Sequence, residues 1–323
     1  MKRKTILVIL LLVIISLSGC NANNKNGKNI KEVKKSAAPK KKIALVMKTL
    51  TNPFFIEMEK GARKAEEELN IDLMVKTGAQ ETSVEQQINI IEELINLKVD
   101  GIVIAPVNAT DIIPILKKAQ AAKISIVNVD DKLDSAVCEK IGLKDIPFVS
   151  IDNENSAYLS AKYLSNMINK PTKVAILEGI PDASNSEKRK SGAIRAFKEN
   201  KNITIVAVET AHWKIDEGFS VTERILKNNP EVGAIFCAND MMALGANEYV
   251  QRLGRKDIKI AGFDALEEVK KEIQKNNIIV TVDQQPQQQG YKGIEYVNRL
   301  INGEKLSMET IIPAKVINKE DVK

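Results

Sequence analysis

The chain has 323 residues, a formal net charge of +6 and 44% hydrophobic residues, which fits a globular protein of two domains. Much of the positive charge lies in the first 42 residues, so the net charge is a poor argument for nucleic-acid binding. His212 is the only histidine, which argues against His-based catalytic triads and most catalytic zinc sites.

The first twenty residues have the pattern of a bacterial secretory signal. A basic start over residues 2–4 precedes an apolar run over residues 6–15, which is too short for a membrane span of about 20 residues. Leu17-Ser18-Gly19-Cys20 resembles a lipobox, in which cleavage occurs before the cysteine and the cysteine carries a lipid. We therefore expect a signal peptide over residues 1–19 and lipidation of Cys20. The alternative is an ordinary signal peptide with a chance cysteine.

Residues 20–41 are predicted to form a lipidated flexible tether. Asn and Lys dominate this segment, which has no apolar periodicity and cannot bury enough surface to fold. Its lysines can lie against anionic lipid headgroups. We expect an extracytoplasmic protein that is lipid-anchored to the cell membrane, on its periplasmic side or outer face.

From residue 42 onward, short apolar runs alternate with longer amphipathic stretches. Strands are predicted over residues 43–47, 71–75, 101–105, 125–129, 148–151, 173–177, 203–208, 234–237, 259–263, 278–282 and 315–317. Helices are predicted over residues 53–69, 84–97, 110–122, 154–169, 187–198, 218–227, 240–253 and 287–301. The strands are rich in Val and Ile without alternation, as in parallel sheets covered on both faces. Because the strand–helix series starts a second time, we predict a doubly wound α/β fold in two domains.

Polar and aromatic side chains follow the predicted strands, where open α/β sheets bind their ligands. An uncharged polyhydroxylated ligand needs flat apolar surfaces for its C–H faces and planar polar groups for its hydroxyls. The aromatic candidates are Phe54, Phe55 and Trp213, and the polar candidates are Asn52, Asp130, Arg189, Asn239, Asp264 and Gln284. The residues therefore favour a sugar-like ligand, although Phe54 and Phe55 could instead only pack their own helix.

Other kinds of site are disfavoured. There is no phosphate-binding P-loop and no G-x-S-x-G motif, and Lys48-Thr49-Leu50-Thr51 occupies the turn where a dinucleotide site needs glycines. Asp130 with Asp131, or Asp240 with Asp264, could serve a glycosidase, but such carboxylates more often accept hydroxyls or cap helices. We expect no enzyme activity, no cofactor and no metal.

The two cysteines beyond the signal give no further chemistry. Cys138 is expected in a loop, and Cys237 is expected in a buried strand as a small apolar side chain.

The chain from about residue 42 to its end resembles the ribose-type periplasmic sugar-binding proteins of ABC importers. The stretches that carry the resemblance are IALVMKTLTNPFF (43–55), GIVIAP (101–106), AIFCANDMMALGA (234–246) and IAGFD (260–264). The resemblance implies a type I periplasmic binding protein fold, α/β, with two Rossmann-like lobes of parallel sheets joined by three crossover strands. It implies an N-terminal lobe of residues 42–151 plus 284–312, and a C-terminal lobe of residues 152–283 plus 313–323.

The same resemblance implies a role for each candidate side chain. The first lobe would contribute Asn52, Phe54, Phe55 and Asp130, the second lobe Arg189, Trp213, Asn239 and Asp264, and the last crossover Gln284. These positions are among those that follow the predicted strands.

Three positions depart from the ribose-binding pattern. Asp131 replaces an arginine, Lys48 replaces a serine and Ala105 replaces an asparagine. Lys48 and Asp131 join the predicted ligand-binding residues, with Lys48 neutralising Asp131 across the cleft or lying solvated at its rim. An unpaired buried group costs ~1–3 kcal/mol, so ribose is not the favoured ligand. Another pentose, a hexose, a sugar alcohol, a cyclitol or a furanose signal molecule stays open.

The expected mechanism is capture of a sugar or polyol by hinge closure, followed by delivery to an ABC transporter permease. Residues 148–152, 263–264 and 283–285 would form the crossovers, and we expect a monomer. One alternative is a receptor that feeds a sensor kinase or chemoreceptor. A regulator of the lactose-repressor class would need a helix-turn-helix before residue 42, where the signal and tether stand. An extracellular enzyme is disfavoured by the single histidine.

Overall fold

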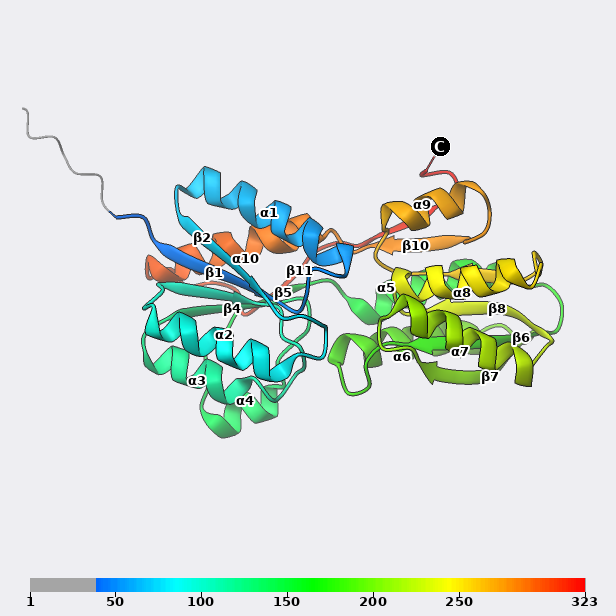
Figure 1. Cartoon of the computed structure of the whole chain (residues 1–323), viewed down its shortest axis with the longest axis horizontal. Coiled ribbons are helices and arrows are strands. Elements are labelled where there is room, and N and C mark those ends of the chain that lie inside the picture. Colours follow the sequence, from blue (N-terminus) through cyan, green and yellow to red (C-terminus); the bar gives the residue numbers. More distant parts are fainter. Residues whose placement is uncertain (1–38, 323) are drawn as a thin grey trace, which may run out of the picture. The chain divides into compact units, whose positions relative to one another are not determined.

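A computed structural model describes residues 39–322, in which two six-stranded sheets are each covered by helices (Figure 1). The predicted signal peptide, Cys20 and almost all of the predicted tether lie outside the described residues. Within residues 39–322 the chain forms ten helices and twelve strands. None of the helices in this part of the chain is both long and apolar enough to cross a bilayer.

The first sheet has the strand order β11-β5-β4-β3-β1-β2, and all of its strand pairs are parallel. Its strands are β1 (Lys42–Met47), β2 (Asp72–Thr77), β3 (Gly101–Ile104), β4 (Ser125–Val129), β5 (Phe148–Ser150) and β11 (Glu309–Ile311). Alternate residues of β1 enter two different apolar clusters, with Leu45 on one face and Val46 on the other. Both faces of the sheet are therefore buried, as the unbroken apolar runs predict.

The helices of the first sheet are α1 (Pro53–Leu69), α2 (Val84–Asn96), α3 (Ile113–Ala121), α4 (Ser135–Ile141) and α10 (Pro286–Ile301). Two glycines let α1 and α10 pack closely: a Cβ on Gly61 would lie 1.9 Å from the Gln287 carbonyl oxygen, and one on Gly290 would lie 2.0 Å from that of Met58. The helix α10, near the C-terminal end of the sequence, is thereby packed closely onto α1, the first helix of the fold. We call these elements and their sheet the first lobe.

The second sheet has the order β12-β10-β9-β8-β6-β7 and is parallel except for the antiparallel pair of β10 and β12. Its strands are β6 (Thr172–Glu178), β7 (Ile203–Thr210), β8 (Val232–Cys237), β9 (Lys259–Ala261), β10 (Val280–Asp283) and β12 (Lys315–Asn318). Its helices are α5 (Asn153–Asn166), α6 (Ser184–Lys198), α7 (Ile215–Asn228), α8 (Asp240–Arg252) and α9 (Glu267–Gln274). We call this set the second lobe.

The chain passes between the lobes three times, which confirms the predicted α/β fold with three crossovers. The crossings follow β5, β10 and β11. Two of them fall where they were predicted, but residues 263–264 connect β9 to α9 inside the second lobe, so that crossover prediction is wrong. The third crossing is the short segment 312–314 between β11 and β12, because these two strands belong to different sheets.

Three short elements were not predicted: α4, α9 and β11. The seven residues of α4 include no fully buried side chain, so they lack the apolar periodicity on which the prediction depended. Cys138 consequently lies in a helix rather than in a loop. Cys237 lies fully buried in β8.

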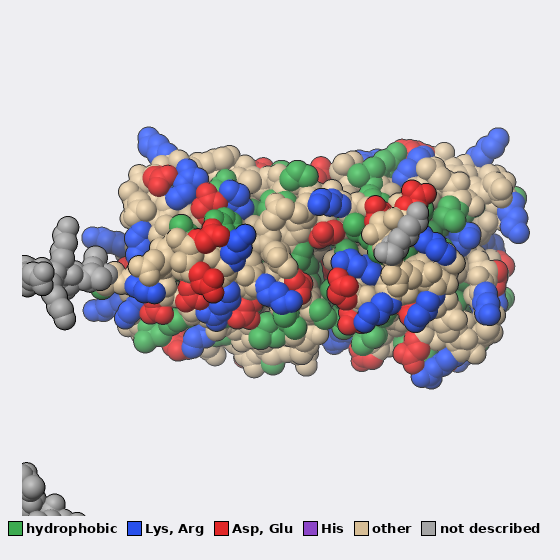
Figure 2. Space-filling model, turned by 90° about the horizontal axis from the view of Figure 1, so that it is seen from above, with side chains coloured by type: hydrophobic (Ala, Val, Ile, Leu, Met, Phe, Trp, Pro, Cys, Tyr) green, Lys and Arg blue, Asp and Glu red, His purple; other side chains and the backbone are tan. Residues whose placement is uncertain are grey.

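The surface of the described residues carries both signs of charge. In the view of Figure 2, basic and acidic side chains are interspersed over the face that is shown. Ion pairs on the surface of the described residues include Lys60 with Glu57 and Lys162 with Glu199.

Candidate ligand-binding site between the lobes

Strand ends from both lobes line a small cavity with a volume of about 20 Å³. The residues that line it are Lys48, Asn52, Phe54, Phe55, Glu81, Asp130, Asn185, Arg189, Trp213, Asn239, Asp264 and Gln284. All of the predicted ligand-binding residues are among them except Asp131.

Asn52 is fixed at the start of α1 by both ends of its amide. Its Oδ1 accepts a hydrogen bond from the Phe54 backbone N–H at 3.1 Å, which caps the helix. Its Nδ2 donates to Glu81 Oε1 at 2.9 Å. Glu81, in the loop after β2, was not predicted as a site residue.

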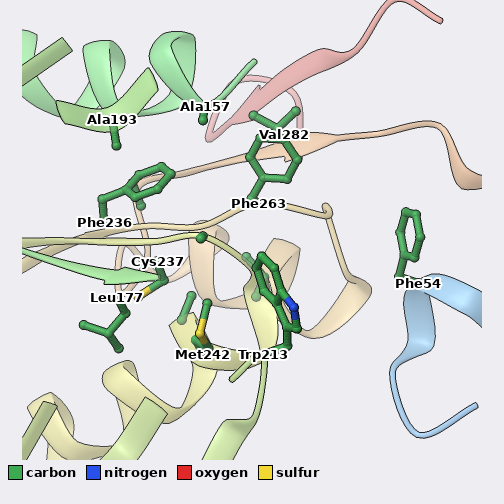
Figure 3. Packing of buried hydrophobic residues seen from close by; sticks show 14 of the residues in the cluster. Phe54, Ala157, Leu177, Ala193, Trp213, Phe236, Cys237, Met242, Phe263 and Val282 are labelled. Carbon is green, nitrogen blue, oxygen red and sulfur yellow. The ribbon is translucent and has the colours of Figure 1, made fainter. Parts of the chain in front are cut away.

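Phe54 and Phe55 pack edge to face, with ring centroids 5.1 Å apart and an interplanar angle of 81°. Both rings are buried in the main apolar cluster, so they do pack their helix as the alternative interpretation held. They also line the cavity, and Figure 3 shows Phe54 across from Trp213. The two interpretations are therefore compatible.

Lys48 forms an ion pair with Asp130, with Nζ 3.2 Å from Oδ2, and both groups are buried in the first lobe. Burial lowers the pKa of the Lys48 ammonium, but the charges of Asp130 and Asp131 outweigh this and leave the pKa above its ordinary value. The expected pairing across the cleft is wrong, because Lys48 and Asp131 lie in the same lobe and the ion pair of Lys48 is with Asp130. The charge of Lys48 nevertheless opposes the rise that burial causes in the pKa of Asp131. The alternative of a solvated rim lysine is also wrong, since Lys48 is only 1% exposed.

Arg189 is the fixed cation of the second lobe. Its Nε donates to Asn153 Oδ1 at 2.8 Å and its Nη1 donates to the Ala238 carbonyl oxygen at 3.0 Å. Its guanidinium lies 3.9 Å from the centroid of the Phe263 ring, and Figure 3 shows Phe263 beside Trp213. Burial lowers the pKa of Arg189, and the nearby charge of Asp264 opposes this effect. Arginine stays charged at any ordinary pH.

Asp264 and Gln284 form the polar wall next to Arg189. Gln284 Nε2 donates to Asp264 Oδ1 at 2.5 Å, and Arg189 Nη1 lies 3.6 Å from the same oxygen. Burial raises the pKa of Asp264 well above its ordinary value, although the charge of Arg189 opposes the shift. Gln284 Oε1 is buried and has no hydrogen-bond partner within residues 39–322, which leaves an acceptor for a ligand hydroxyl.

Trp213 forms the aromatic face of the second lobe. Its ring packs directly on Gly179, where a Cβ would lie 2.0 Å from the ring. Its buried Nε1–H has no partner among the described residues, and Figure 3 shows this nitrogen on the side that faces Phe54. Asn239 supports the Trp213 backbone through Nδ2, which donates to the Trp213 carbonyl oxygen at 3.2 Å, while its Oδ1 caps α8.

Asp240 does not line the cavity. It is fully buried, and it accepts hydrogen bonds from the Thr281 hydroxyl and the Leu266 N–H, each at 2.8 Å. Burial raises the pKa of Asp240 to about 6. Asp240 and Asp264 therefore do not form a pair of carboxylates that face a common substrate.

Asp131 also stays out of the cavity, because its side chain points to the start of α6. Two residues that line the cavity, Glu81 and Asn185, were not predicted. Glu81 lies in the loop after β2, and Asn185 lies near the start of α6, after β6. Both therefore follow strand ends, the same signal that identifies the predicted residues.

Comparison with known proteins agrees with this architecture. Residues 43–305 match the family described as "Periplasmic binding protein domain". The chain belongs to this family of periplasmic binding proteins. This binding protein is 34% identical over 270 residues to the D-ribose/D-allose-binding protein of Pseudomonas aeruginosa. The alignment covers 82% of this chain and 83% of the relative. It is 30% identical over 254 residues to the D-allose-binding periplasmic protein of Escherichia coli. That alignment covers 78% of this chain and 82% of the relative.

Solved structures lead to the same family. The binding protein is similar to an ABC transporter periplasmic solute binding protein from Actinobacillus succinogenes with bound D-allose. The TM-score is 0.84 at 38% identity, and the match covers 88% of this chain and 99% of the other. The two relatives are sugar-binding proteins and the solved structure is an ABC transporter solute binding protein, so this protein is a binding protein and not an enzyme.

Proposed function

We propose that this binding protein captures a neutral monosaccharide between its lobes, with D-allose favoured over D-ribose. The observation that carries the proposal is a single cavity that combines aromatic faces from Phe54 and Trp213 with the planar polar groups of Arg189 and Gln284. Sugars need this combination, because their C–H faces are apolar and each hydroxyl both donates and accepts hydrogen bonds.

Two observations support D-allose over D-ribose. The Escherichia coli relative is named for D-allose alone and the similar solved structure contains D-allose, whereas the Pseudomonas aeruginosa relative is named for both sugars. The polar pair of Lys48 with Asp130 also places a donor and an acceptor together in the first lobe. Such a pair can engage two neighbouring hydroxyls at once, and an aldohexose has one hydroxyl more than a pentose.

The proposed mechanism is hinge closure. We propose that residues 42–151 with 284–312, and residues 152–283 with 313–323, move as two bodies about the three crossings. A ligand that contacts Asp130 on one body and Arg189 on the other favours the closed form, because it binds that form more tightly. The closed protein then delivers its sugar to an ABC permease.

The first test is binding of D-allose, D-ribose and D-glucose by the purified protein, measured by thermal unfolding and calorimetry. D-glucose is the matched control, because it differs from D-allose only in the configuration at C3. A ligand at a thousandfold excess over its Kd stabilises the folded protein by ~4 kcal/mol. We expect this stabilisation with D-allose and none with D-glucose, and the absence of any effect with all three sugars would reject the proposal.

Anchoring and delivery are tested in cells. We propose that Cys20 carries a lipid that holds the protein near its permease. Cys20→Ala is expected to move the protein from the membrane fraction to the soluble fraction and to slow uptake of labelled D-allose. If the protein binds the sugar but its deletion leaves uptake unchanged, delivery to a permease is contradicted and a receptor function gains support.

A further inference from the structure

Asp131 connects the two lobes directly. Its Oδ1 accepts a hydrogen bond from the Asn185 backbone N–H at 3.0 Å. Asp131 follows β4 in the first lobe, and Asn185 is the second residue of α6 in the second lobe. Within residues 39–322, this is the one hydrogen bond that joins the lobes outside the three crossing segments.

The start of α6 depends on this bond. The residue before the helix is Ala183, whose side chain cannot accept a hydrogen bond, and α6 has no side-chain cap of its own. The first N–H groups of a helix have no partner inside the helix and are stabilised by a nearby carboxylate. Asp131 supplies that carboxylate from the other lobe, so the cap exists only while the lobes are together.

The helix that is capped in this way carries two side chains of the cavity. Asn185 and Arg189 both lie on α6 and line the cavity, whereas Asp131 is fully buried outside it. Any movement of α6 relative to β4 would displace both side chains from a ligand that rests against the first lobe. Asp131 is therefore placed to act on the ligand through α6.

We propose that Asp131 is a positioning residue that caps α6 across the lobes, and thereby holds the closed form together and keeps Asn185 and Arg189 over the ligand. The inference rests on the proposed capture of a sugar by closure, and it adds a residue that acts without touching the sugar. Loss of the cap should shorten the lifetime of the closed complex. It should do so equally for every ligand, because Asp131 is not among the residues that line the cavity.

The first experiment compares Asp131→Ala with Asp134→Ala. Asp134 caps α4 through the Val137 N–H at 2.8 Å, so its variant removes the same kind of bond within a single lobe. Stopped-flow measurement with D-allose and D-ribose should show that Asp131→Ala raises koff about tenfold, since a cap contributes roughly 0.5–2 kcal/mol, and leaves kon nearly unchanged. The ratio of the two affinities should not change. Asp131→Asn, which keeps an acceptor oxygen, should restore most of the slow dissociation.

The second experiment needs no sugar. Spin labels at Asn89→Cys and Ser220→Cys, in a Cys138→Ser background, report the distance between exposed sites on α2 and α7. Asp131→Ala should shift the distances to longer values and Asp134→Ala should not. If the protein binds none of the sugars but Asp131→Ala still lengthens the distance between the spin labels, the proposed ligand is rejected and the role of Asp131 in holding the lobes is supported.

Two results would overturn the inference. One is an unchanged koff together with unchanged lobe distances in Asp131→Ala. The other is an affinity loss in Asp131→Ala that differs between D-allose and D-ribose, which would make Asp131 a direct sugar contact.

Discussion

Gln284 Nε2 lies 2.5 Å from Asp264 Oδ1, which ties the crossing segment after β10 to the cavity wall of the second lobe. The same carboxylate lies beside the buried Arg189 guanidinium. One carboxylate therefore supports a hinge segment, a cation and the cavity surface. Its removal should affect both ligand binding and stability.

Asp264→Asn and Asp264→Ala should separate these two effects. Both variants remove the carboxylate charge beside Arg189, which should cost up to ~3–5 kcal/mol of stability and lower the affinity for D-allose. Asparagine keeps an oxygen that can accept from Gln284, so Asp264→Asn should lose less stability than Asp264→Ala. Urea unfolding and calorimetry measure the two quantities. Equal stability of both variants would contradict the role assigned to the Gln284 hydrogen bond.

The ion pair of Lys48 and Asp130 should behave as a coupled unit. Lys48→Met leaves buried carboxylates unpaired and should destabilise the protein by ~3–5 kcal/mol, whereas adding Asp130→Asn should recover part of the loss. A double-mutant cycle of unfolding free energies measures the coupling. Additive effects of the two substitutions would show that Lys48 is stabilised chiefly by another carboxylate.

Asp240 should make stability depend on pH. Its pKa is about 6 in the folded protein, above the ordinary value of 3.8, so the folded state holds a proton that the unfolded state loses first. The contribution of protonated Asp240 to the free energy of unfolding is complete below about pH 4, and it is lost as the pH rises through about 6. Asp240→Asn should flatten the decline in unfolding free energy over this interval, relative to the unsubstituted protein. An unchanged pH profile would assign the decline to other groups.

Gly179→Ala should disturb the aromatic wall of the cavity. A Cβ at this position would overlap the Trp213 ring, so the ring must move, at a cost of ~1–3 kcal/mol and with a loss of D-allose affinity. Gly233→Ala is the control, because its Cβ would lie 3.0 Å from only the Thr172 methyl group. Tryptophan fluorescence, which reports Trp213 alone in this chain, and calorimetry would detect the change.

The sequence predicts the elements of the fold well where the local signals are strong. The first helix was predicted over its observed range Pro53–Leu69, and the structure shows why these limits are sharp: Asn52 caps its start, and Asn70, in a left-handed conformation, follows its end. The helix α4 has similar end signals in Asp134 and Gly142 but too few apolar residues to be recognised. The strand β11 has three half-buried or exposed residues, and its place is set by its pairing with β5.

The candidate site shows where sequence reasoning ends. The sequence locates Asp130 and Asp131 at the end of β4, but it does not tell which of them faces the cavity. Asp130 has a φ of 65°, an uncommon left-handed conformation, and the side chain that follows it points to α6. The partner of Lys48 depends on the same local backbone. The roles of the cavity residues in binding stay predictions until a ligand is measured.

The close packing of α10 on α1 has a consequence for how the chain reaches its folded state. The first lobe needs residues 286–301 to cover its sheet and β11 to complete the sheet edge, so it is assembled from both ends of the chain. A growing polypeptide that ends before these residues lacks the contacts that complete this lobe. Folding must therefore wait for long-range contacts made near the end of synthesis, and such contacts slow folding. A chain that folds late stays extended for longer, which is the form in which a polypeptide can be threaded through a narrow pore.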